Sequence, residues 1–126
     1  MTLIEKVTLA DSLDAIQEHW RPRVVGALNG QEVKLAKFCG SFPWHHHEEA
    51  DELFLGVTGR FRVEFRDGAV ELGPGEFVIV PRGVEHRTVA AAEASVMLFE
   101  PAGVRNTGNV VDPEFTALPE DARGEQ

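Results

Sequence analysis

Residues 60–83 read RFRVEFRDGAVELGPGEFVIVPRG, a run of short apolar segments separated by turn residues. Within residues 60–66 apolar and charged side chains alternate, which is the pattern of a strand with one buried face. The pair DG at 67–68 and the triplet GPG at 73–75 supply turns, because glycine adopts positive φ readily and proline cannot continue a hydrogen-bonded ladder. This stretch therefore predicts a series of short antiparallel strands.

Strand signals continue on both sides of this stretch. Asn29-Gly30 separates two apolar segments and predicts a hairpin, since both turn positions of such a hairpin have positive φ. A further strand is expected around residues 95–99. Residues 53–57 and 77–80 are apolar on both faces, which predicts that both faces of these strands are covered. Turns about every eight to twelve residues are typical of a β-sandwich or barrel, so the expected fold class is all-β.

A helical pattern is confined to residues 11–20, where Leu13, Ile16 and Trp20 recur on one face before Pro22. An Asp-Ser pair at its start can cap this helix. The helix is short, so it must lie on a larger β structure. The outer cover of the doubly apolar strands is then either this helix or a partner subunit, and we expect a homodimer.

The chain has 126 residues and a mass of 13.9 kDa, the size of one domain, which we expect over residues 1–118. Residues 119–126 are polar and acidic and are predicted to form a flexible tail. Twelve Lys and Arg against 21 Asp and Glu give a net charge of −9, which disfavours nucleic acid and anionic membranes as partners. The single Cys39 excludes an intrachain disulfide, and no signal-peptide or membrane-spanning pattern is present, so a cytoplasmic location is expected.

Three consecutive histidines precede the strand predicted at residues 53–57. In an extended segment His45 and His47 point to one side and His46 to the other, because side chains two apart share a face. Glu52 heads the strand, and His86 follows a tight turn. Three imidazoles and one carboxylate that converge from neighbouring strands would bind one divalent metal ion: iron, manganese, nickel, cobalt or zinc, among which this ligand set does not choose.

Such a site would leave coordination positions open for water, dioxygen or a chelating substrate. One carboxylate against a divalent ion leaves a net positive charge, which favours anionic or enolate-like ligands. We therefore expect a small molecule as the partner. No catalytic residue beyond the ligands stands out: the chain has no tyrosine, and Arg82 and Arg105 are expected to be solvated.

These residues resemble the two sequence motifs of the cupin family. Residues 40–59 contain a glycine at each end, the His-x-His pair and Glu52 of the first motif, and residues 75–90 contain Gly, Pro-x-Gly and His86 of the second. Gly40 lies one residue nearer to the histidines than in the family pattern. Counted strictly, it would select His46, but that register provides no second histidine. Ala90 replaces the final Asn of the second motif, a position that we take as structural.

The resemblance implies a small double-stranded β-helix barrel with a short N-terminal helix. It also implies a metal site formed by His45, His47, Glu52 and His86. Similar proteins include dioxygenases and sugar isomerases, which favours a metalloenzyme. The alternatives are a module that binds a small ligand or a metal without turnover, and a metal that only stabilises the fold.

Overall fold

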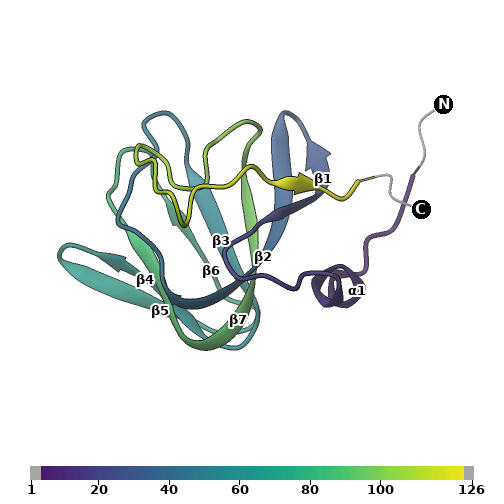
Figure 1. Ribbon diagram of the computed structural model, residues 1–126, viewed down its shortest axis with the longest axis horizontal. Helices are drawn as coiled ribbons and strands as arrows, with labels where there is room; N and C mark the ends of the chain where they lie inside the picture. Colours follow the sequence, from purple (N-terminus) through teal and green to yellow (C-terminus); the bar gives the residue numbers. More distant parts are fainter. Residues whose placement is uncertain (1–3, 124–126) are drawn as a thin grey trace.

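The computed structural model describes residues 4–123 and shows strands that curl into a barrel, with one short helix outside it (Figure 1). In chain order the elements are α1 (Leu9–Asp14), β1 (Arg23–Leu28), β2 (Gln31–Ser41), β3 (Glu52–Thr58), β4 (Phe61–Phe65), β5 (Gly68–Leu72), β6 (Phe77–Val80), β7 (Arg87–Pro101) and β8 (Glu120–Asp121). The predicted all-β barrel with a short N-terminal helix is confirmed.

The long strand β7 organises the sheet. It pairs antiparallel with β2 over most of its length, with β3 through its second half and with β4 through its first residues. The strand order is β5-β4-β7-β2-β1-β8, and β3 carries β6 on its other side. The sequence predicted only residues 95–99 of this strand, because the alanine-rich stretch before them shows no clear alternation.

The hairpin predicted at Asn29-Gly30 is confirmed. Leu28 pairs with Gln31 across the turn that joins β1 and β2, and the two turn residues have φ values of 52° and 78°. Asparagine and glycine tolerate this left-handed conformation best, so the local sequence sets the register of these two strands.

The helix is shorter than predicted. It covers Leu9–Asp14 instead of residues 11–20, and its N-cap residue makes no side-chain hydrogen bond. Trp20 leaves the helical path with a φ of 64°. Its indole nitrogen donates to the Cys39 carbonyl at 3.0 Å, and its ring stacks on Phe38 at a centroid distance of 4.5 Å. Packing in the barrel therefore outweighs the helical pattern at this residue.

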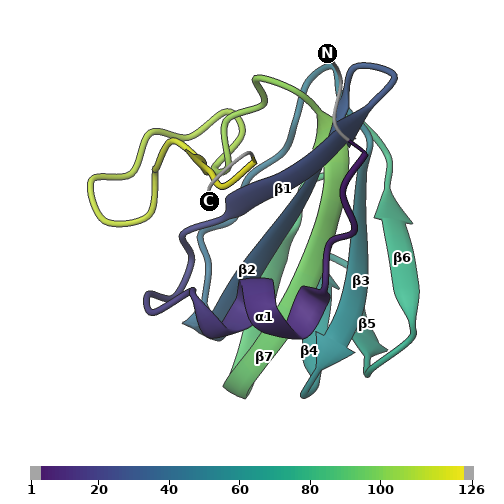
Figure 2. The same cartoon turned by 90° about the vertical axis from the view of Figure 1, so that its right-hand side faces the viewer.

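Apolar side chains form two clusters, one inside the barrel and one outside. The outer cluster joins Leu13 and Ile16 to Leu35, so that α1 covers one part of the outer sheet face (Figure 2). The prediction that both faces of β6 are covered is wrong within this chain. The outward side chains of Phe77 and Ile79 are 60% and 53% exposed, because the short helix does not extend to this edge of the sheet.

After β7 the chain crosses one end of the barrel in a segment that we call the C-terminal strap (residues 102–118). Phe115 in this strap contacts the rings of Trp20 and Phe42. Part of the predicted tail then forms β8, which pairs parallel with β1, while residues 124–126 lie outside the described residues. No helix of residues 4–123 is long and apolar enough to span a membrane.

Candidate metal centre

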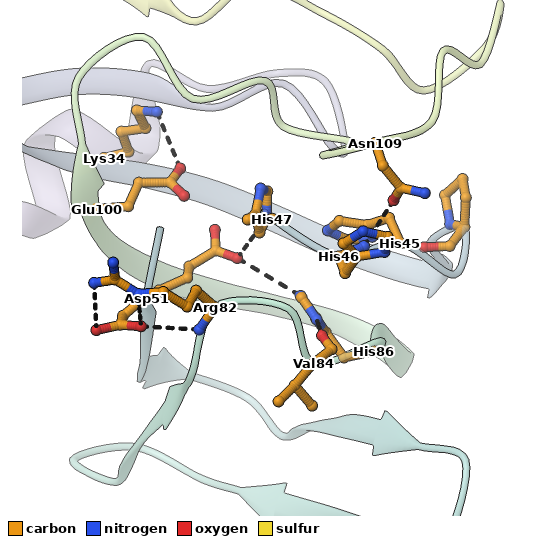
Figure 3. A network of polar contacts seen from close by, with 12 residues as sticks. Lys34, His45, His46, His47, Asp51, Arg82, Val84, His86, Glu100 and Asn109 are labelled. Carbon is orange, nitrogen blue, oxygen red and sulfur yellow. Dashed lines mark hydrogen bonds and ion pairs between the residues drawn. The ribbon is translucent and has the colours of Figure 1, made fainter. Parts of the chain in front are cut away.

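Four side chains from two separate segments of the sequence meet inside the barrel, and we call them the histidine–glutamate cluster (His45, His47, Glu52 and His86). One nitrogen or oxygen atom from each lies within 4.8 Å of the corresponding atoms of the other three. All four residues are buried, with at most 5% of each exposed. Figure 3 shows the three histidines of the cluster with their neighbours. The structure thus brings together the four residues that the sequence singled out.

Backbone hydrogen bonds hold the two halves of the cluster in place. His45 and His86 form an antiparallel bridge, in which each backbone amide donates to the other residue's carbonyl at 2.9 Å. Gly83 donates to the His47 carbonyl at 2.8 Å from the turn before His86. This pairing explains why His45 and His86, which are 41 positions apart in sequence, converge on one point.

The imidazole rings of His45 and His86 are oriented by hydrogen bonds on their outer nitrogens. Nδ1 of His45 lies 2.9 Å from the Pro43 carbonyl, and Nδ1 of His86 lies 2.8 Å from the Val84 carbonyl. A carbonyl only accepts, so Nδ1 carries the proton in both rings. The lone pair of Nε2 is then free to face the cluster, the arrangement by which metal-ligating histidines are held.

Several buried polar atoms of the cluster have no hydrogen-bond partner. They are Nε2 of His86, both ring nitrogens of His47 and Oε1 of Glu52. Nε2 of His47 lies 3.1 Å from Oε1 of Glu52, but without the alignment of a hydrogen bond. Each unsatisfied buried group costs about 1–3 kcal/mol. A divalent cation would accept one lone pair from each of these residues, and the donor set fits such an ion.

The protonation states of the cluster are also suited to a cation. Burial, and then the neighbouring His86, lower the pKa of His45 to about 4, so this imidazole is neutral at pH 7. Burial by itself would raise the pKa of the Glu52 carboxyl. The adjacent imidazoles of His47 and His86 outweigh burial and hold that pKa well below its usual range. Both groups are therefore deprotonated at neutral pH, as metal ligands must be.

A cavity of about 40 Å³ adjoins the cluster, with His45 and Glu52 in its wall. Most of the remaining wall is apolar and aromatic, and its rings come from Trp20, Phe38, Phe42 and Phe54. One water molecule needs roughly 10–15 Å³ of such space, so the cavity has room for about three waters. A ligand at the cluster would thus meet a narrow, mainly apolar interior.

Two charged residues that sequence reasoning missed also face this cavity. Lys34 on β2 and Glu100 on β7 are 2% exposed each, and Nζ of Lys34 donates to Oε1 of Glu100 at 3.1 Å (Figure 3). Burial and the neighbouring Glu52 raise the pKa of Glu100 well above its usual range, although Lys34 opposes this shift. Lys34, Ala36 and Phe38 are spaced two residues apart, so their side chains share one face of β2. This spacing was the signal that could have revealed an inward-facing lysine.

The neighbouring polar residues lie away from the cluster. His46 points outward, and its Nε2 lies 2.5 Å from Oε1 of Glu48. Asp51 accepts hydrogen bonds from the backbone amide and the guanidinium of Arg82 at 2.8 and 3.3 Å, so these two residues hold each other at the surface. Arg105 is exposed and donates to a backbone carbonyl of its own loop. The expectation that these side chains are solvent-facing agrees with their positions.

The C-terminal strap is attached to the segment that carries His45 and His47. The backbone amide of His46 donates to Oδ1 of Asn109 at 2.8 Å, and the amide of Asn109 donates to the His46 carbonyl at 3.0 Å. Gly108 lies against the same carbonyl, with a φ of 56°. The segment that carries two histidines of the cluster is therefore fastened from its outer side by the strap.

Comparison with known proteins agrees with this architecture. A family model described as cupin domain matches residues 30–100. The chain is 37% identical to a cupin-2 domain containing protein from Shewanella frigidimarina, whose crystal structure gives a TM-score of 0.74 over 75% of this chain and 93% of that chain. It is 32% identical to NMB1881 from Neisseria meningitidis, with a TM-score of 0.71 over 78% of this chain and 100% of that chain.

A third relative is the protein YdbB of Bacillus subtilis (strain 168), which is 35% identical over 65 residues. That alignment covers 51% of this chain and 58% of YdbB, so the match spans little more than half of the relative. The family model, by contrast, covers both motifs and most of the barrel strands. On the strength of that match, the chain belongs to the cupin family.

Proposed function

We propose that the histidine–glutamate cluster binds one divalent metal ion and that the protein is a small-molecule metalloenzyme. The observation that carries the proposal is the set of buried nitrogen and oxygen atoms without hydrogen-bond partners. Burial of apolar side chains at these positions would cost less free energy than burial of several polar atoms without partners. Iron, manganese, nickel, cobalt and zinc all suit three imidazoles and one carboxylate.

In this proposal the protein residues orient the ligands and exclude water. The Pro43 and Val84 carbonyls hold His45 and His86 so that Nε2 faces the ion, and the aromatic wall of the cavity keeps bulk water away. When bound, the ion would supply Lewis-acid activation of a chelating substrate, or redox chemistry with dioxygen if it is iron. An isomerase and a dioxygenase are the two reaction types that we propose.

The first experiment is elemental mass spectrometry of the protein purified without a histidine tag or a nickel column. We expect about one equivalent of a divalent metal per chain. His47→Ala should lose most of this metal, whereas His46→Ala, the matched control at the adjacent outward position, should retain it. A site that no added divalent ion fills would refute the proposal, and metal loss in His46→Ala alone would show that the register of the first motif is shifted.

The second candidate is a module that binds a small ligand without turnover. One observation favours it. Every buried histidine among the described residues belongs to the cluster, so no further histidine is available in the interior as a catalytic acid or base. Cupin barrels commonly bind small ligands. Dioxygen uptake and product formation with a panel of anionic chelating compounds separate the two candidates. Binding without turnover across the panel would favour the module.

We also propose that the protein is a homodimer and that its exposed apolar sheet face is the interface. Two rows of apolar side chains cross the outer face of β6, β3 and β7: Ile79–Leu53–Phe99 and Phe77–Leu55–Met97. No charged side chain interrupts these rows, although the chain carries a net charge of −9. Phe77 and Ile79 each leave on the order of 100 Å² uncovered. They would form the centre of an interface of about 800 Å² per partner.

The remaining proposals concern the setting of the protein. We propose that residues 1–118 form the functional domain and that it works in the cytoplasm. The acidic surface supports the absence of nucleic-acid and membrane partners, because a net charge of −9 repels phosphate groups.

A further inference from the structure

The ion pair of Lys34 and Glu100 lies on the cavity wall next to the candidate metal centre. Its two charged groups are 3.1 Å apart, and their side chains are only 2% and 3% exposed. Glu32 approaches the same ammonium group at 3.7 Å. A second, charged subsite therefore adjoins the histidine–glutamate cluster in a cavity whose remaining wall is mainly apolar, with Thr88 and Asn106 as its other polar residues.

Stability does not explain this ion pair. The cost of removing two charges from water is of the same size as their attraction, so well-packed apolar residues at such positions are often equally or more stabilising. The neighbouring wall residues are apolar, as expected for a barrel core: Phe54 and Leu98 lie in the same cross-strand row as Lys34. The two charges are the exception in this part of the interior.

The carboxyl group of Glu100 is also incompletely satisfied. Its Oε1 accepts from Lys34, but its Oε2 is buried and has no hydrogen-bond partner. Such an oxygen costs free energy unless water or a ligand contacts it. Because Glu100 lines the cavity, a molecule in the cavity can reach this oxygen.

We propose that Lys34 and Glu100 form a subsite for a hydroxyl group of the ligand, and that the ligand is a small hydroxylated carboxylate whose other end chelates the metal. This inference rests on the proposed metal site. A hydroxyl group both donates and accepts, so it can pair with the Glu100 carboxyl and with the Lys34 ammonium together. A second anionic group would instead face the carboxylate of Glu52 beside the Glu100 carboxyl group, and a cationic group would face Lys34.

The size of the cavity limits this ligand. A volume of about 40 Å³ admits about three water-sized groups, which suits a carbon and a hydroxyl beyond the chelating end. Glycerate and lactate are suitable probes. Both chelate a metal through the same 2-hydroxycarboxylate group, but only glycerate carries a second hydroxyl group on its last carbon.

The experiment compares the affinities of these two probes for cobalt(II)-loaded protein, measured by calorimetry and by the visible spectrum of the cobalt. Each enantiomer is titrated separately. We expect one enantiomer of glycerate to bind about tenfold to a hundredfold more tightly than lactate, the range for a hydrogen bond to a charged group. In the double variant Lys34→Met/Glu100→Leu this preference should fall to less than about threefold, while lactate affinity and cobalt content stay unchanged.

Two further variants keep the result interpretable. Glu100→Gln preserves the shape of the side chain and should fold even if the double variant does not, and we expect it to keep an intermediate preference for glycerate. The matched control Arg60→Met/Glu71→Leu removes an ion pair that is exposed on both sides, and it should behave like the wild type.

The outcomes distinguish this inference from the proposed function. If the wild-type protein binds cobalt but shows no preference for glycerate, or if the double variant keeps the preference, the hydroxyl subsite is wrong and the metal site stands. A Glu100→Gln variant with an undiminished preference would also overturn the subsite. Failure of the wild-type protein to bind cobalt or any other divalent ion would overturn both.

Discussion

Gly108 of the C-terminal strap lies against the segment that carries His45 and His47, and its replacement by alanine tests whether the strap supports the histidine–glutamate cluster. A Cβ atom at this position would lie 2.1 Å from the His46 carbonyl oxygen and 3.0 Å from Cδ2 of His45. Relief of the first contact needs a shift of about 1 Å, and in a packed site such overpacking costs about 1–3 kcal/mol. The φ of 56° adds about 1–2 kcal/mol for a residue with a Cβ.

Gly108→Ala should therefore lower the free energy of unfolding by about 2–5 kcal/mol, a large part of the total for a domain of this size. The control is Gly103→Ala in the same strap. Its φ is 84°, but its Cβ would have no neighbour within 4 Å, so it should cost only the backbone part of about 1–2 kcal/mol. Urea denaturation of the metal-free protein measures both variants, and the difference between them isolates the close contact.

A displaced His46 also moves the two histidines on either side of it. We expect Gly108→Ala to weaken metal binding by about tenfold or more, the size of effect that outer-shell changes produce, while Gly103→Ala leaves it unchanged. Equal stabilities and equal metal affinities in the two variants would refute the reasoning that the strap presses on the cluster.

Two further predictions concern acid sensitivity and assembly. Because the pKa of His45 is lowered to about 4, its contribution to stability is complete above about pH 6.5 and is lost as the pH falls towards 4. Urea denaturation of the metal-free protein should show a loss of about 2 kcal/mol between pH 7 and pH 5 that disappears in His45→Gln; an equal loss in that variant would assign the effect to other groups. Sedimentation equilibrium should give a mass of twice 13.9 kDa for the wild type and a mass of 13.9 kDa for Phe77→Glu. The control is Val111→Glu, at a residue of the strap that is 70% exposed, and it should keep the mass of the wild type. A monomeric wild type would contradict the homodimer.

Local patterns account for the parts of the fold that were predicted correctly. The alternation in residues 60–66 and the positive-φ turn at Asn29-Gly30 depend only on neighbouring residues, so both predict structure without knowledge of the rest of the chain. The helix prediction was wrong after Asp14 for the opposite reason. Trp20 has its partners on β2, and contacts between distant segments outweighed its local helical spacing.

Part of the candidate site was likewise predictable from the sequence, and part of it was not. The period of two in an extended segment predicted that His45 and His47 share a face, and the resemblance to the two cupin motifs implied that Glu52 and His86 join them. Metal binding by this cluster stays a prediction. The orientation of the rings by backbone carbonyls, and the atoms left without partners, required the tertiary structure.

By itself the sequence determined the all-β fold class, the central hairpins and the residues of the candidate metal centre, since each follows from periodicity, turn chemistry or a short motif. Only the tertiary structure decided what surrounds that centre. The ion pair of Lys34 and Glu100 joins strands β2 and β7, the hydrogen bonds of Asn109 join the strap to His46, and the exposed rows on β6 depend on how far α1 extends. These are contacts between segments far apart in the chain, and no local pattern specifies them.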